Sequence, residues 1–215
     1  MAKIIGQSEG VLLETLTWCL RCATREQLQR IMAVRFSSTL AVAGVIRRLT
    51  QNEEIESRST VVAFPEITKP LFTWSPRQSP PNFHALAWKL EKRWKAVRPR
   101  RAILCWATKK GAHRTGGVAC FPERATQVEH DLGTAAVYTH LCQSQPPMAE
   151  GWVGEDILRR DYAPRERWLS KIPDAAIYQN EQLQYILEFG GQYSVNRLRR
   201  FHQHSQECRL SYILY

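Results

Sequence analysis

Two acidic residues, each at the end of a short apolar run, constrain this chain more than any other feature. Asp174 follows Ile172-Pro173 and leads into the apolar run 175–178, and Glu188 closes the run 183–187. Apolar runs of this length around a polar break predict two buried strands joined as a hairpin. A buried carboxylate is costly unless it is paired. A divalent metal ion bound by Asp174 and Glu188, with Mg²⁺ as the candidate, is one way to offset the two charges.

A purely structural explanation of the same two acids stays open. Asp174 could cap a turn at the start of its strand, and Glu188 could pair with Arg197 or Arg200 of the helix that the sequence predicts over 194–206. In that case the pair would carry no catalysis.

The overall charge indicates the kind of partner. The 215 residues carry a formal net charge of +10, which favours a polyanion, and double-stranded DNA is the partner that we expect. No apolar run reaches the roughly 18 residues that a membrane-spanning helix needs. The six cysteines are scattered, so we expect them to be reduced and the protein to be cytoplasmic.

The N-terminal residues predict a winged helix-turn-helix domain over 1–79. Apolar residues at helical spacing predict helices over 9–22 and 42–49, and Thr24 with Gln27 has the pattern of a capping box that begins a helix between them. Short β-forming runs at 54–58, 61–64 and 71–74 follow and predict a hairpin, which would be the wing. Winged-helix proteins often pair, so a homodimer is possible.

Candidate DNA contacts follow from this assignment. In a winged helix the third helix enters the major groove, and its N-terminal and outward side chains contact phosphates and bases. The residues so placed are Ser38, Thr39, Arg47, Arg48 and, on the wing, Arg58. The alternative is a protein-docking winged helix whose arginines are only solvated.

A cluster of prolines between residues 65 and 81 predicts a boundary near residue 80, after which a helix begins at Asn82. Its apolar stripe predicts core packing. Its basic face and the residues after it could follow a phosphate backbone, or could simply face solvent. The candidates are Lys92, Arg93, Arg100 and Arg101.

The remaining residues, 80–215, predict strand, helix, strand hairpin, helix and strand, an α/β order with a mixed sheet. With the acids at Pro173-Asp174 and Glu188, this order resembles the PD-(D/E)xK nuclease superfamily, whose restriction-endonuclease-like core would make the whole chain an α+β protein. More narrowly, the chain resembles the replication-relaxation family of plasmids and other mobile elements. That resemblance rests on His130-Asp131-Leu132, Pro173-Asp174 and Leu187-Glu188.

The resemblance implies a site with one part missing. Asp174 and Glu188 would be catalytic and would hold Mg²⁺, and Glu129 on the preceding helix would add a further carboxylate. The lysine that these nucleases carry two residues after the glutamate is Gly190 here. Gln192 could position water in its place but brings no positive charge. We interpret His130 as a helix histidine packed or hydrogen-bonded in place.

The sequence therefore supports a DNA-binding protein of a mobile element, acting in replication, mobilisation or their regulation, whose nuclease-like domain has lost catalysis. Other replication or mobilisation proteins are possible partners. The first alternative is a Mg²⁺-dependent DNA endonuclease or nickase that its winged helix targets. The second is an interaction module whose basic surface contacts an acidic protein.

Overall fold

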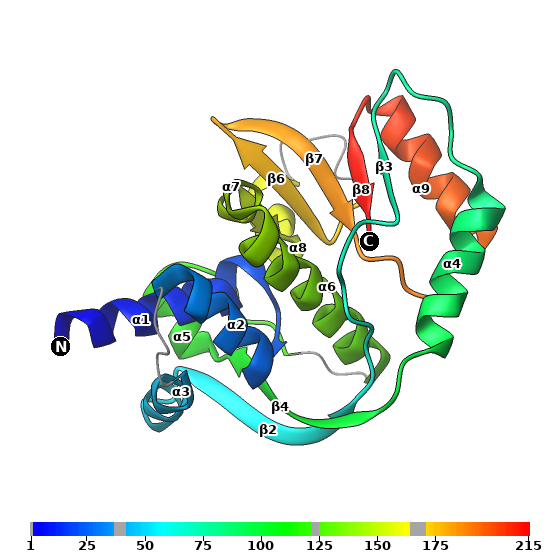
Figure 1. The fold of residues 1–215 in the computed structure, drawn as a ribbon. Coiled ribbons are helices and arrows are strands. Elements are labelled where there is room, and N and C mark those ends of the chain that lie inside the picture. The colour runs from blue at the N-terminus through cyan, green and yellow to red at the C-terminus, as the bar shows by residue number, and fades with distance from the viewer. Residues whose placement is uncertain (1, 37–41, 122–124, 164–170) are drawn as a thin grey trace.

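The computed structural model describes residues 2–36, 42–121, 125–163 and 171–215. It is an α+β structure with two sheets (Figure 1). In these parts of the chain, no helix combines the length and the apolar character that crossing a membrane requires. Ser38 and Thr39, two of the expected DNA contacts, lie outside the described residues.

The N-terminal helices form where the apolar spacing predicts them. Helix α1 (Ala2–Glu14) continues into a π-helical turn, η1 (Thr15–Cys19), and α2 (Arg25–Phe36) and α3 (Val42–Gln51) follow. The predicted capping box is confirmed, because the backbone N–H of Gln27 donates to Thr24 Oγ1 at 3.2 Å and the backbone N–H of Thr24 donates to Gln27 Oε1 at 2.8 Å. The apolar face of α3 is buried in the core.

The predicted hairpin over 54–74 is wrong. Strand β2 (Ile55–Val62) is one continuous strand and pairs antiparallel with β4 (Arg100–Ala107), whereas β3 (Phe72–Trp74) pairs with β8 (Tyr212–Leu214) of the other sheet. Pro65 and Pro70 stand between β2 and β3 and cannot donate to a ladder, so this stretch leaves the first sheet and does not turn back along it.

These pairings cross the position near residue 80 where we placed the domain boundary. The first sheet, of order β1-β4-β2 with β1 at Ala23–Thr24, is completed by a strand from beyond residue 80. The second sheet, of order β3-β8-β7-β6-β5, includes β3, which precedes residue 80. Helix α4 (Phe83–Lys95) begins at Asn82, as predicted, with Asn82 Oδ1 accepting a hydrogen bond from the N–H of Ala85 at 3.0 Å.

The predicted hairpin of the two acidic strands is confirmed. Strands β6 (Ala175–Gln179) and β7 (Gln182–Glu188) pair antiparallel, and Asn180 and Glu181 both have positive φ in the turn between them. Strand β5 (Trp152–Gly154) extends the sheet beside β6, and β8 runs parallel to β7 on the other side.

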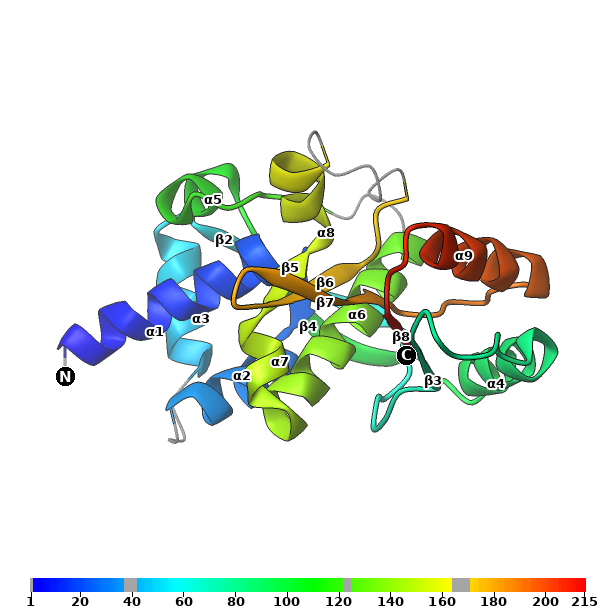
Figure 2. The ribbon, with the colours of Figure 1, turned by 90° about the horizontal axis from the view of Figure 1, so that it is seen from above.

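The other helices are arranged around the two sheets (Figures 1 and 2). Helix α6 (Ala125–Ser144) packs against α2 on one side and places Gly133 against Phe189, just after β7, on the other. One continuous apolar core therefore extends from α1 through α6 to the second sheet. The remaining helices are α5 (Lys109–Thr115), α7 (Pro146–Glu150), α8 (Glu155–Ile157), η2 (Leu158–Tyr162) and α9 (Val195–Glu207), which packs against α4.

Candidate functional site

The hairpin places the two acids opposite each other. Ala175 pairs with Leu187, so Asp174 lies across from Glu188, and residues opposite each other in an antiparallel pair have side chains on the same face. The Asp174 side chain is only 12% exposed. Its Oδ2 accepts a hydrogen bond of 2.7 Å from the backbone N–H of Phe189, which ties the start of β6 to the end of β7.

A histidine from α6 completes this pair. His130 Nε2 lies 3.5 Å from Asp174 Oδ2, and the imidazole packs edge-on against Phe189 with 5.5 Å between the ring centroids. Burial lowers the pKa of His130, but the nearby carboxylates, Asp174 first among them, outweigh burial and raise it to about 9. The ring is therefore a cation at neutral pH and offsets the charge of Asp174.

Glu188 is held by a different set of side chains. The Tyr193 hydroxyl donates to Glu188 Oε1 at 2.5 Å, and Arg197 Nη2 donates to the same hydroxyl at 2.9 Å. Burial first, and then the charge of Asp174, raise the pKa of Glu188 to about 8. Burial also raises the pKa of Asp174. The acid pair thus has partners within the protein: a cation for Asp174, and a hydroxyl for Glu188.

The position of the missing lysine is filled by packing. A Cβ added to Gly190 would lie 2.5 Å from Leu90 Cδ2, and Leu90 is fully buried on α4. The Gly190 N–H donates to the carbonyl of Tyr215 at 2.9 Å, and its carbonyl accepts from Arg93 Nη2 at 2.6 Å. The chain therefore leaves the acid pair directly after Glu188, and any side chain at residue 190 would have to displace the buried Leu90.

The other two expected catalytic residues, Glu129 and Gln192, form no hydrogen bond or ion pair with Asp174 or Glu188 within the described residues. Glu129 is half-buried on α6, and Gln192 is exposed ahead of α9. His130, the neighbour of Glu129, occupies the place beside the acids that the sequence reasoning gave to the glutamate.

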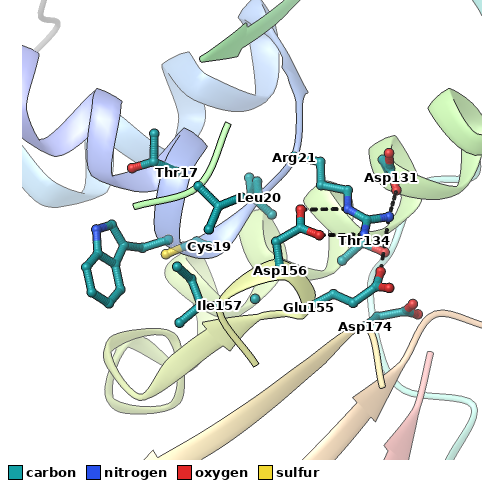
Figure 3. A pocket seen from close by; sticks show the side chains of 13 residues that line it. Thr17, Cys19, Leu20, Arg21, Asp131, Thr134, Glu155, Asp156, Ile157 and Asp174 are labelled. Carbon is teal, nitrogen blue, oxygen red and sulfur yellow. Dashed lines mark hydrogen bonds and ion pairs between the residues drawn. The ribbon is translucent and has the colours of Figure 1, made fainter. Parts of the chain in front are cut away.

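A second cluster, which the sequence reasoning missed, lies next to Asp174 around the same pocket (Figure 3). Arg21 binds Asp156 through Nε at 2.8 Å and Nη2 at 2.7 Å, and its Nη1 lies 3.1 Å from Glu155 Oε2 and 3.8 Å from Asp131 Oδ1. Burial lowers the pKa of Arg21, and the three carboxylates raise it by more. These residues are far apart in the sequence, and the only local indication was the acidic start of α8.

The cavity between the two clusters is small. Its volume is about 30 Å³, and Asp131, Thr134, Glu155 and Asp174 are among the residues that line it. Asp131 Oδ2 and Thr134 Oγ1 are buried there without a hydrogen-bond partner in the described structure. A cavity of this size accommodates water, since one molecule needs roughly 10–15 Å³ on this measure.

The donor set does not fit a bound Mg²⁺ as it stands. No group of three or more histidine, cysteine, aspartate or glutamate side chains in the described parts of the chain is arranged to hold a metal ion. Mg²⁺ requires near-octahedral oxygen coordination, whereas one oxygen of each acid already accepts a hydrogen bond and a cationic histidine faces Asp174. Metal binding by Asp174 and Glu188 stays a prediction.

Most of the described candidate DNA contacts lie at the surface. Arg47 on α3 and Arg58 on β2 are exposed, and so are Arg100 and Arg101 at the start of β4. Other charged or aromatic groups already engage some of the candidates. Arg48 Nε donates to Glu9 Oε1 at 2.6 Å, Lys92 lies 5.0 Å from the Trp88 ring centroid, and Arg100 lies 4.7 Å from that of Phe64.

Arg93 does not belong to a solvent-facing basic surface, and this corrects the expectation from the sequence. Its Nη2 donates to the carbonyls of Gly190 and Tyr215, and the guanidinium lies 5.0 Å from the Phe189 ring centroid. Burial lowers the pKa of Arg93 to about 10. The side chain fixes α4 to the ends of β7 and β8, because it donates hydrogen bonds to the backbone carbonyls of Gly190 and Tyr215, which follow those strands.

Comparison with known proteins adds no relative to this description. No protein-family model matches the chain, and neither a curated protein nor a solved structure matches it significantly.

Proposed function

We propose that this protein binds double-stranded DNA through the unit formed by α1, α2, α3 and the first sheet. The observation that carries the proposal is the arrangement of this unit: a helix, a short strand, two helices and two strands, in a sheet of order β1-β4-β2. A winged helix-turn-helix has this plan. Arg47 on the third helix and Arg58 on β2, the strand that follows it, are both exposed, as DNA-facing residues need to be.

In this proposal the second sheet is a nuclease-like core that contributes affinity and does not cleave. The packing of Gly190 against Leu90 and the internal partners of Asp174 and Glu188 support this part. Without a cation at position 190, the usual charge relief at a scissile phosphate is missing. A role in the replication or mobilisation of a plasmid or other mobile element follows from the family resemblance. The three motifs that carry the resemblance, around His130, Asp174 and Glu188, meet at one site.

Fluorescence anisotropy with a labelled duplex, at 50 mM salt and above, tests the proposal. Loss of Arg47 and Arg58 together should weaken binding markedly, because each removes a cation from the surface that would face the DNA. The matched control is Lys69→Ala/Arg77→Ala, which removes the same charge from exposed positions outside that surface. Equal affinities for wild type and Arg47→Ala/Arg58→Ala would contradict the assignment, as would an equal loss in the control.

A metal-dependent endonuclease is the second candidate, because Asp174 and Glu188 share one face of the hairpin. Plasmid nicking with added Mg²⁺ or Mn²⁺ separates the two functions. Cleavage by the wild type that disappears in both Asp174→Ala and Glu188→Ala would establish the enzyme. We expect no cleavage that depends on these two residues.

A further inference from the structure

A groove beside the acid pair brings three basic side chains together with an apolar lining. Its volume is about 370 Å³, and its lining includes Lys171, Arg197 and Arg200, the carboxyl group of Glu188, and the apolar side chains of Pro173 and Phe201. Lys171 comes from the segment before β6 and the two arginines from α9. The groove therefore begins where the acid pair ends, because Glu188 belongs to both.

The three cations are available to a ligand. All three residues are exposed, and none forms an ion pair with a carboxylate within the part of the chain that the structure describes. Arg197 and Arg200 are three residues apart and so lie on the same side of α9. Lys171 Nζ donates to the backbone carbonyl of Arg200 at 3.4 Å, which places the ammonium against α9. Three positive groups against one carboxyl group leave the groove with a net positive charge.

The Glu188 carboxyl group does not close the groove. Its Oε1 accepts the Tyr193 hydroxyl, and Arg197 donates to that hydroxyl through Nη2. The Arg197 guanidinium lies only 3.7 Å from the Tyr193 ring centroid. It is therefore held over a rigid aromatic face, and less side-chain entropy is lost when it binds an anion.

We infer that this groove holds one sugar–phosphate unit of a DNA strand, with the phosphate between Lys171, Arg197 and Arg200 and the deoxyribose against Pro173 and Phe201. The inference rests on the proposed DNA binding and adds a second contact surface to it, far along the chain from α3. Guanidinium and ammonium groups are the usual partners of phosphate oxygens, and the apolar lining matches the hydrocarbon face of a sugar. The strand would then pass along the edge of the acid pair.

The test compares two double variants of the full-length chain on the same labelled duplex. Lys171→Ala/Arg200→Ala removes two groove cations and leaves Arg197, Tyr193 and the acid pair intact. Lys69→Ala/Arg199→Ala removes equal charge outside the groove lining, and Arg199 lies on the same helix. We expect the groove variant to lose roughly tenfold in affinity. Its plot of log K against log salt should become shallower by up to about 0.9, because the groove neutralises one phosphate.

The outcomes separate this inference from the proposed function. If wild type binds the duplex and the groove variant binds equally well, or no worse than the control, the groove assignment fails while DNA binding stands. If wild type does not bind DNA, both fail. Competition arms with inorganic phosphate and with polyglutamate identify the ligand. Displacement of the duplex by polyglutamate at equal charge would overturn the DNA assignment. A further outcome is that inorganic phosphate shifts the Arg197 and Arg200 side-chain NMR signals while the groove variant binds the duplex as tightly as the wild type. That combination would show that the groove binds only a free ion, and it would overturn the assignment to a DNA strand.

Discussion

The contact between Gly133 and Phe189 allows the sharpest test of the packing that builds the site. A Cβ added at Gly133 would lie 2.1 Å from two Phe189 ring atoms and 2.7 Å from a third. Phe189 is 1% exposed, so its ring cannot move away without disturbing the core around it. Forcing extra atoms into such a core costs about 1–3 kcal/mol, and the gain in helix propensity from glycine to alanine offsets up to about 1 kcal/mol of it. A contact of 2.1 Å with a buried ring places the packing cost in the upper part of that range, about 2–3 kcal/mol. We therefore expect Gly133→Ala to destabilise the protein by about 1–2 kcal/mol net.

Gly10→Ala is the matched control, because Gly10 also lies inside a helix but a Cβ there would meet nothing within 4 Å. That variant should be neutral or more stable by up to about 1 kcal/mol. At roughly 2–4 °C per kcal/mol for a chain of this size, thermal unfolding should show the two melting temperatures moving in opposite directions. The His130 imidazole resonances should also shift in Gly133→Ala, since the ring packs against Phe189. Equal melting temperatures for the two variants would refute the proposed packing of α6 on β7.

Three further predictions concern the charges around the acid pair. Arg21→Met leaves Asp156 and its neighbours unpaired and should lower the free energy of unfolding in urea by about 3–5 kcal/mol. The control is Arg159→Met, which removes a more exposed partner of Glu155 and should cost no more than about 1 kcal/mol. Similar costs for the two variants would refute the role of Arg21. The folded-state pKa values of His130, about 9 against 6.5, and of Glu188, about 8 against 4.5, are both raised, so the folded protein keeps protons that the unfolded chain releases. The free energy of unfolding should therefore fall as the pH rises from about 4.5 to about 9, by at most about 1.4 kcal/mol per pH unit for each group. The free energy of unfolding of Glu188→Gln should fall less steeply over the same pH range. A free energy of unfolding that rises with pH there would contradict the proposed charges of the cluster. Gly190→Lys, which restores the lysine of the nuclease motif, should lower the melting temperature and produce no Mg²⁺-dependent plasmid cleavage, because the Cβ meets Leu90; a stable, active variant would overturn the explanation for the missing lysine.

Local patterns in the sequence were enough to predict several elements. The capping box at Thr24 and Gln27, the helix start at Asn82 and the hairpin that carries Asp174 and Glu188 all depend on residues close together in the chain, and all are confirmed. The pairing of β2 could not be predicted in the same way. The partner of β2 is β4, and a 37-residue excursion (63–99) separates the two strands in the chain, so no turn signal marks the pairing.

The site shows the same difference between local and long-range information. The register of one hairpin places Asp174 beside Glu188, which the spacing could predict. Whether Glu129 or His130 faces that pair depends on how α6 is rotated against the sheet, and the fit of Gly133 to Phe189 determines this rotation. Arg21 meets acids more than 100 residues away, and nothing near it in the sequence indicates a partner.

The affinity of the intact protein for a short duplex, measured across 50 to 200 mM salt, tests the central claim most directly. If basic side chains on α3, β2 and α9 neutralise several phosphates, the affinity should fall steeply and linearly on logarithmic axes, with a slope of about −0.9 for each phosphate contacted. A complex that is indifferent to salt, or no complex at 50 mM, would contradict the account.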